Sequence, residues 1–116
     1  MYKEYHKIIL LEEFKKKCEQ EPSFINSSFT EEMIKEHSTN SLAGRYMVKE
    51  CFDKLVPFNI DYREIEIKNN SMGKPVMEVK GTLKKQLTKE KIELVDCSIS
   101  HSRERAVGYL ILKFKD

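Results

Sequence analysis

The sequence has 116 residues, of which 40% are hydrophobic and 34% charged, and this composition excludes a disordered chain and predicts one domain over residues 1–116. The net charge of +2 comes from 21 basic and 19 acidic residues, and this near balance argues against a general nucleic-acid-binding protein. The longest aliphatic run extends only from Ile8 to Leu11, so no segment is expected to span a membrane.

The first half of the chain is predicted to be helical, because apolar residues recur at helical spacing and capping residues precede them. The predicted helices span residues 10–20, 30–37 and 42–56. Pro22 and the polar run 26–28 are expected to break the first helix. Thr30 is the expected cap of the second helix, a second cap lies within residues 38–41, and Pro57 is expected to stop the third.

The second half is predicted to consist mainly of strands, because its apolar residues alternate. The predicted strands span residues 62–68, 75–80, 93–100 and 106–114, with a short helix over 82–91. Residues 69–73 form a turn between the first two strands. The last strand carries apolar side chains on both faces, so we expect helices to cover one face and a second subunit to cover the other. The fold class is α+β, with an antiparallel sheet packed by helices.

The cysteines and histidines indicate neither a disulfide framework nor a zinc site. Cys18, Cys51 and Cys97 are widely spaced in apolar contexts, which is typical of buried thiols in a cytoplasmic protein. No histidine lies at metal-ligand spacing from a cysteine. The chain does not open with the basic and then apolar pattern of a signal peptide, so we expect a cytoplasmic location.

Three stretches carry polar residues in patterns that would allow chemistry. The stretch LAGRYMVKECFDK, residues 42–54, places Glu50 one helical turn before Lys54. Two interpretations fit this spacing: a solvated ion pair on a helix surface, or a carboxylate that holds a cation beside a lysine that contacts a phosphate.

The other two stretches are NSMGKP at 70–75 and SISHSRER at 98–105. The first is expected to form a hairpin turn, in which Gly73 adopts a positive φ and Pro75 opens the next strand. The second places His101 between two serines at the mouth of an apolar hairpin. That histidine either caps the end of a strand or lies beside a reacting group.

Four blocks occur in an order and at spacings that together are similar to one known family. They are FTEEMI at 29–34, SLAGRYMVKECFDK at 41–54, EIEIKNNSMGKP at 64–75 and SISHSRERAVGYLIL at 98–112. The sequence thus resembles the phosphopantetheinyl transferase superfamily, specifically its small holo-acyl-carrier-protein synthase type.

The resemblance implies a 4′-phosphopantetheinyl transferase-like fold and a transferase that uses coenzyme A as its substrate. Such an enzyme moves the 4′-phosphopantetheine arm onto a serine of an acyl carrier protein, which serves fatty acid, polyketide or peptide synthesis, and it leaves 3′,5′-ADP. The resemblance also implies Mg²⁺ as the cofactor. It further implies a homotrimer with sites between the subunits.

The resemblance assigns roles to particular residues. Glu50 matches the family's metal-binding helix glutamate, and Lys54 matches a lysine that contacts a phosphate of coenzyme A. His101 matches the histidine beside the reacting group. The further positions that lie near the coenzyme or shape its site are Arg45, Lys49 and Lys74. The base that removes the serine proton would be Glu50, a metal-bound water or His101.

The sequence departs from the family pattern at three places. The family opens with a glycine-x-aspartate strand whose aspartate binds Mg²⁺, and a count without gaps back from FTEEMI places Lys7 there. The acid and the arginine that follow in the pattern fall on Leu10 and Glu13, and LVPFNID replaces a glycine-rich loop. Either the Lys7 ammonium lies where the cation would be, or Glu4 or Glu12 supplies the carboxylate. The alternative to an enzyme is a non-catalytic module that binds coenzyme A or a carrier protein.

Overall fold

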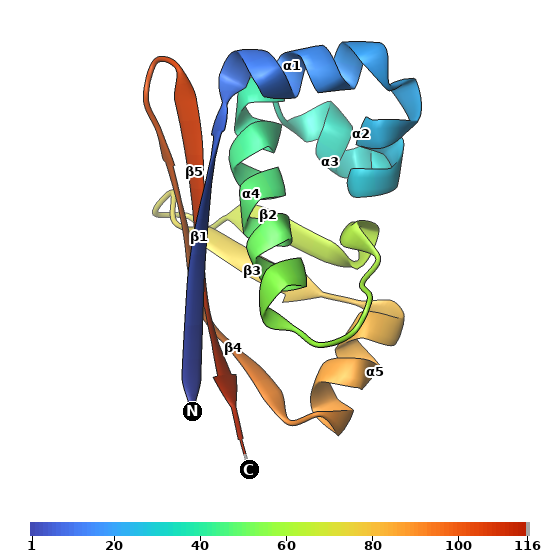
Figure 1. Cartoon of the computed structure of the whole chain (residues 1–116), viewed down its shortest axis with the longest axis vertical. Coiled ribbons are helices and arrows are strands. Elements are labelled where there is room, and N and C mark those ends of the chain that lie inside the picture. The colour runs from blue at the N-terminus through green and yellow to red at the C-terminus, as the bar shows by residue number, and fades with distance from the viewer. Residues whose placement is uncertain (116) are drawn as a thin grey trace.

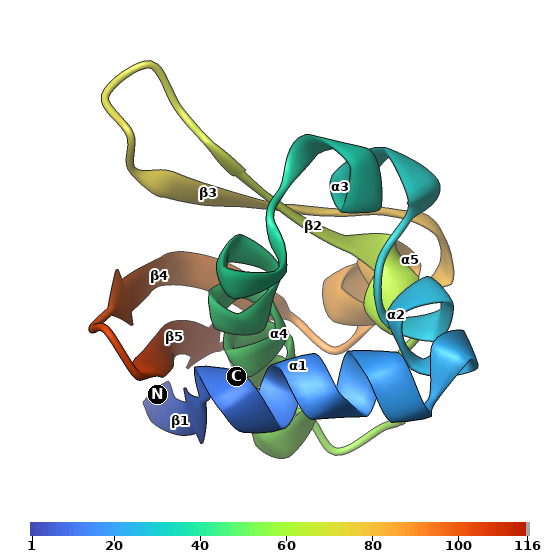
Figure 2. The same cartoon turned by 90° about the horizontal axis from the view of Figure 1, so that it is seen from above.

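In the computed structural model, which describes residues 1–115, helix α4 (Thr39–Leu55) lies in the angle between two antiparallel sheets (Figures 1 and 2). The first sheet has the strand order β1 (Tyr2–Leu10), β5 (Arg105–Phe114), β4 (Ile92–His101), and the second is the hairpin of β2 (Ile65–Asn69) and β3 (Pro75–Val79). The predicted α+β class is confirmed, although the strands divide into two sheets and the pattern analysis did not predict β1.

The remaining helices lie with α4 on one side of the first sheet (Figure 1). They are α1 (Leu11–Gln20), α2 (Pro22–Ser28), α3 (Glu31–Glu36), the short 3₁₀ helix η1 (Tyr62–Glu64) and α5 (Gly81–Lys89). Both predicted caps are present: the Thr30 hydroxyl accepts a hydrogen bond from the Met33 amide at 3.3 Å, and the Ser38 hydroxyl accepts one from the Ser41 amide at 3.2 Å. The cap at Ser38 starts α4 three residues earlier than the sequence predicted.

One helix was missed and one strand was predicted too long, and each difference has a simple physical reason. The first helix ends at Gln20, before Pro22, as predicted, but Pro22 then opens α2, which the sequence analysis did not predict. A proline in the first helical turn has no amide hydrogen bond to lose. Residues 62–64 form η1 rather than a strand, because the Asp61 side chain accepts a hydrogen bond from the Arg63 amide at 3.0 Å and caps a tight turn.

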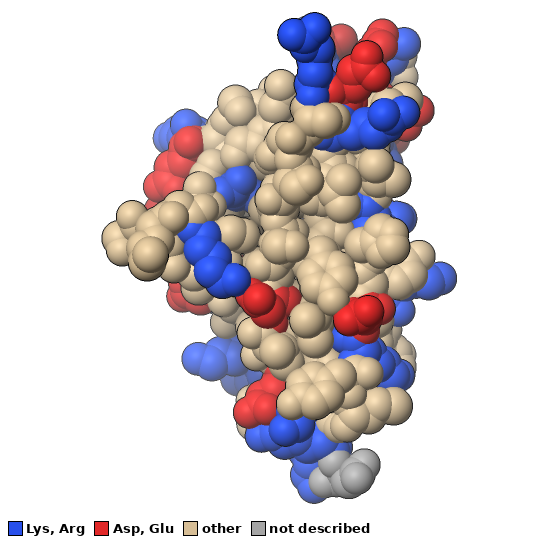
Figure 3. Space-filling model, turned by 90° about the vertical axis from the view of Figure 1, so that its left-hand side faces the viewer, with Lys and Arg blue, Asp and Glu red and all other residues tan. Residues whose placement is uncertain are grey.

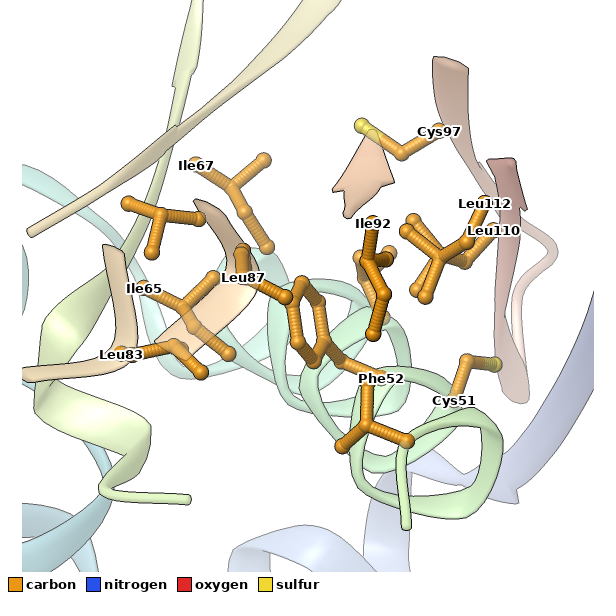
Figure 4. Close-up of a cluster of buried hydrophobic side chains, with 13 residues drawn as sticks. Cys51, Phe52, Ile65, Ile67, Leu83, Leu87, Ile92, Cys97, Leu110 and Leu112 are labelled. Atoms are coloured by element: carbon orange, nitrogen blue, oxygen red, sulfur yellow. The ribbon is translucent and has the colours of Figure 1, made fainter. Parts of the chain in front are cut away.

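The larger hydrophobic core fills the space between the two sheets (Figure 4). Phe52 of α4 lies between Ile65 on the hairpin and Leu110 on the three-stranded sheet, and all three side chains are fully buried. Each such side chain contributes about 1.5–3 kcal/mol through burial. Cys51 and Cys97 are buried as predicted, whereas Cys18 is only half-buried. The core therefore holds α4 in one position against both sheets.

Gly108 lets α4 approach the first sheet very closely. A Cβ atom at this position would lie 2.5 Å from the Val48 amide nitrogen and 2.7 Å from the Met47 carbonyl carbon. Such distances are well inside van der Waals contact, so no larger residue fits without displacing backbone. Gly108 also pairs across the strands with Lys7 of β1. This close approach of the helix to the sheet therefore lies beside Lys7.

The other face of the first sheet is open. In β5, Ala106 and Leu110 are buried on the helix side, while Val107, Tyr109 and Ile111 are half-buried on the open side. Figure 3 shows this side of the molecule as a largely uncharged surface. The predicted apolar character of both faces is confirmed, and the second subunit remains a prediction. Within residues 1–115, no helix combines the length and apolarity needed to cross a membrane.

Candidate functional site

Lys7 and Glu50 form an ion pair between β1 and α4. The Lys7 Nζ atom donates a hydrogen bond to Glu50 Oε2 at 2.9 Å, and the two side chains are 38% and 26% exposed. The hydrogen bond to Glu50 raises the pKa of Lys7 above its ordinary value, against the opposing effect of partial burial. The ammonium therefore remains charged at neutral pH, and both groups keep an open side toward solvent.

Of the three residues that the sequence offered as neighbours of Glu50, only Lys7 reaches it. Glu4 lies on the opposite face of the sheet, where its carboxylate accepts a hydrogen bond from the Tyr109 hydroxyl at 2.7 Å. Glu12 is on α1, with its side chain 80% exposed and paired with Lys16 at 3.6 Å. Neither acid adds a second carboxylate beside Glu50.

Lys54 lies one helical turn after Glu50 and is exposed. The surface ion pair between Glu50 and Lys54 that the spacing allowed is not formed, because the Glu50 carboxylate pairs with Lys7 instead. Within residues 1–115, no acidic side chain lies within ion-pair distance of the Lys54 ammonium. It is therefore free to bind an anion.

Arg45 is buried at 3% exposure and acts inside the fold. Its guanidinium donates to the Ile67 carbonyl at 2.8 Å, to the Asn69 side-chain oxygen at 3.1 Å and to the Ser41 hydroxyl at 2.7 Å. These bonds fasten the end of β2 to the first turns of α4. Arg45 therefore shapes the hairpin rather than presenting a charge at the surface.

Lys49 is fully buried, at 0% exposure. Its ammonium donates to the carbonyl oxygens of Ser28 and Tyr62, each at 2.7 Å, and lies 4.4 Å from the centroid of the Phe29 ring. Burial lowers the pKa of Lys49 to about 7, although nearby acids oppose this shift. Lys49 therefore holds the end of α2 and η1 against α4, and its charge is directed at backbone carbonyls.

Lys74 lies in the hairpin turn and forms an ion pair with Asp96 of β4 at 2.9 Å. The pair borders a cavity of about 240 Å³ between β3 and β4, which Cys97 and Leu110 also line. Sequence reasoning singled out Lys74 but not its partner. Asp96 lies 22 positions further along the chain, and only the packing of the hairpin against β4 brings the two together.

His101 lies at the end of β4, with its ring nitrogen Nε2 3.0 Å from the backbone carbonyl oxygen of Asn40. A carbonyl only accepts hydrogen bonds, so Nε2 carries the hydrogen and Nδ1 is the basic nitrogen of the neutral ring. Gly44 makes room for the ring, because a Cβ atom there would lie 3.1 Å from Nε2. The contact defines which nitrogen can accept a proton.

His101 and Glu50 lie far apart within one chain. His101 contacts Asn40 in the first turn of α4, and Glu50 follows ten residues later along the same helix. At 1.5 Å per residue these two positions are about 15 Å apart along the helix axis. The structure thus brings together Lys7 and Glu50, but not the two residues that the family pattern assigns to catalysis.

An aromatic cavity that sequence reasoning missed lies near the same helix. It has a volume of about 500 Å³, and its lining includes Phe24, Tyr46 and Tyr62. Tyr46 is one turn before Glu50, and its ring centroid is 4.9 Å from that of Phe24. Burial and the neighbouring carboxylates raise the pKa of Tyr46 to about 12, so its hydroxyl remains a hydrogen-bond donor at neutral pH. The placement of Glu50 one turn before Lys54 was predicted from the spacing, but the cavity beside them was not.

The residues around Glu50 do not fit a divalent cation within one chain. Mg²⁺ requires oxygen ligands, usually including one or two carboxylates. Residues 1–115 contain no group of three histidine, cysteine, aspartate or glutamate side chains that could hold a metal ion. The side chain that pairs with Glu50 is an ammonium group, which donates hydrogen bonds and cannot ligate a metal.

Three known proteins that are similar to this chain are holo-acyl-carrier-protein synthases. No protein-family model matches the chain. It is 31% identical over 114 residues to a holo-[acyl-carrier-protein] synthase of Clostridium novyi, across 91% of this chain and 83% of that protein. A holo-(acyl-carrier-protein) synthase from Bacillus anthracis, solved in complex with CoA (3′,5′-ADP), is 25% identical with a TM-score of 0.73, covering 97% and 96% of the two chains. The ACPS–CoA complex of Chronobacterium ammoniagenes has a TM-score of 0.86 at 20% identity, covering 100% and 99%, and supports the fold alone.

Proposed function

Because this chain belongs to the holo-[acyl-carrier-protein] synthase family of phosphopantetheinyl transferases, we propose that it loads an acyl carrier protein with the 4′-phosphopantetheine arm of coenzyme A. The serine oxygen of the carrier attacks the β-phosphorus and forms a new phosphodiester bond. The bond between the two phosphates of the diphosphate breaks, and 3′,5′-ADP leaves with the negative charge. The serine proton passes to a base. The site therefore has to bind a diphosphate, stabilise growing charge and accept one proton.

The proposal rests on two lysines at one surface of α4. Lys54 has an ammonium group with no ion-pair partner among residues 1–115. One helical turn before it, Glu50 pairs with Lys7 of β1. Two ammonium groups on one surface suit a diphosphate, because charge-assisted hydrogen bonds to phosphate are stronger than neutral ones. Fixed positive groups also stabilise the charge that develops on the departing phosphate. The relative from Bacillus anthracis supports coenzyme A as the ligand, since it was solved with CoA (3′,5′-ADP).

The proposal places the reaction in the cytoplasm and the site between subunits. The three cysteines are free thiols, as suits a reducing compartment. Within one chain, His101 is about 15 Å from Glu50 and about 21 Å from Lys54 along the axis of α4, which is too far for it to touch the same reacting phosphate as either residue. The open face of β5 offers an apolar surface for a second copy. We therefore propose a homotrimer in which His101 of one subunit faces Glu50 and Lys54 of the next.

Light scattering tests the assembly. At micromolar concentration we expect a mass of about three chains of 13.7 kDa. Val107→Glu should yield monomers, because it places a charge on the face that would be buried. Lys85→Glu, on the exposed side of α5, should remain trimeric. A native protein that is monomeric would contradict the proposal.

Intact-mass analysis tests the transfer itself. An apo carrier protein incubated with coenzyme A and this protein should gain the mass of the phosphopantetheine arm, and 3′,5′-ADP should appear in equal amount. The assay should include a series of carrier proteins from fatty acid, polyketide and peptide synthesis. Coenzyme A binding without any mass gain would instead support the non-catalytic module.

Lys54→Ala is expected to weaken coenzyme A binding by about 10- to 100-fold, because it removes one charge-assisted contact to phosphate, and such contacts are worth about 1.5–3 kcal/mol. Calorimetric titration with coenzyme A measures this loss. Lys85→Ala is the matched control, since it removes an exposed lysine from α5. Equal affinity in Lys54→Ala and the control would show that Lys54 is only a solvated surface residue.

A further inference from the structure

The ion pair of Lys7 with Glu50 places an ammonium group beside the carboxylate that the family pattern assigns to the metal. We propose that the Lys7 ammonium takes the place of the divalent cation, so that it contacts the diphosphate of coenzyme A directly and transfer depends little on Mg²⁺. This inference rests on the proposed function. It assigns to Lys7 the role of a catalytic residue that binds the reacting diphosphate.

The position of Lys7 is built into the fold. Its strand partner is Gly108, and the missing side chain there allows the backbone of α4 at Met47 and Val48 to lie against the sheet. One turn further, Cys51 donates from its thiol to the Gly108 carbonyl at 3.5 Å. The helix therefore cannot move away from β1 without breaking this packing. Glu50 is held within 2.9 Å of the Lys7 ammonium by the same contact.

The pair leaves no suitable place for a divalent cation beside Glu50. Glu50 Oε2 already accepts a hydrogen bond from an ammonium, and a cation bound to that carboxylate would lie close to a like charge. Mg²⁺ also needs further oxygen ligands, but Glu4 points to the other face of the sheet and Glu12 pairs with Lys16. The local charge is already balanced without a metal.

The ammonium still has donors for a ligand. An ammonium group has three N–H donors, and Glu50 takes one of them. The Lys7 side chain is 38% exposed, so the remaining donors can reach an incoming phosphate. Lys54 adds a second ammonium from the next turn of α4. Because Glu50 neutralises the charge of Lys7, Lys54 supplies the net positive charge at this surface, and Lys7 supplies its remaining N–H donors to the diphosphate.

Metal binding gives a first test that does not depend on activity. Mn²⁺ serves as a spectroscopic substitute for Mg²⁺, and paramagnetic resonance counts the bound ion. Native protein is expected to show no saturable site, whereas Lys7→Asp should show one bound Mn²⁺ per chain, because it replaces the ammonium with a second carboxylate. Lys3→Asp makes the same charge change elsewhere on β1 and should bind no better than the native protein. Tight binding by the native protein would overturn the inference.

Coenzyme A binding and transfer in the presence of a chelator give the second test. Under chelation, the coenzyme A affinity and the transfer rate of the native protein should each stay within about twofold of their values with Mg²⁺. Lys7→Met should lose about tenfold or more in coenzyme A affinity under the same conditions. Abolition of native binding by the chelator, or unchanged affinity in Lys7→Met, would overturn the role of Lys7. If no variant transfers under any metal condition, the proposed function fails, while the coenzyme A affinities still decide the role of Lys7.

Discussion

Gly108→Ala is expected to cost about 3 kcal/mol of unfolding free energy and to reduce transfer. The added Cβ would lie 2.5 Å from the Val48 amide nitrogen and 2.7 Å from the Met47 carbonyl carbon, and neither atom can rotate away as a side chain would. Overpacking a core typically costs about 1–3 kcal/mol, and a clash with helix backbone belongs at the upper end of that range. To accept the methyl group, α4 has to move off the sheet, which separates Glu50 from Lys7.

Denaturant titration followed by circular dichroism measures the loss, and two other glycines calibrate it. Gly73→Asn should be nearly neutral, because Gly73 lies in an exposed turn with no atom within 4 Å of the new Cβ, and asparagine tolerates its φ of +79°. Gly44→Ala should cost less than Gly108→Ala, because its closest contact is a side-chain methyl group, Cγ2 of Ile99, rather than helix backbone. A midpoint for Gly108→Ala equal to that of Gly73→Asn would show that the helix approaches the sheet less closely than described.

Features set by local chemistry were predictable from the sequence. Thr30 and Ser38 cap helices because a hydroxyl next to free amide groups needs no tertiary contact. The helical spacing of apolar residues in α4 and their alternation in β5 also predicted which side chains are buried, because the period of the pattern alone decides which side of an element faces inward. Pro22 shows the limit of local rules, because proline is compatible both with the end of one helix and with the start of another.

The candidate site was only partly predictable, because its partners are distant in the chain. Lys7 and Glu50 are 43 residues apart, and their contact requires both the β1–β5 register and the close approach at Gly108. Lys49 illustrates the opposite difficulty. A lysine inside a helical motif is usually expected at the surface, but here two backbone carbonyls at 2.7 Å bind its ammonium in the interior. Spacing located these residues on α4, and only packing determined what each one contacts.

The two ring nitrogens of His101 allow a structural role and a chemical role to be tested separately. Its Nε2 donates to the Asn40 carbonyl, which ties the end of β4 to the start of α4, while Nδ1 remains an acceptor. A positioned general base typically contributes about 10²–10⁴-fold to the rate. A residue that only tied the two elements together would instead affect folding, and any side chain with a suitable donor could replace it.

His101→Ala is therefore expected to slow transfer by about 100-fold or more while changing the coenzyme A dissociation constant by less than about threefold. His101→Gln is the matched control, because its amide nitrogen can donate to the Asn40 carbonyl but the side chain has no basic nitrogen. Both variants should fold and bind coenzyme A, and both should be slow. Recovery of the native rate in His101→Gln would assign His101 to the structural tie alone. Mixing His101→Ala with Lys54→Ala chains tests the shared site. Trimers that combine native Lys54 from one chain with native His101 from another should transfer faster than either variant by itself at the same low coenzyme A concentration.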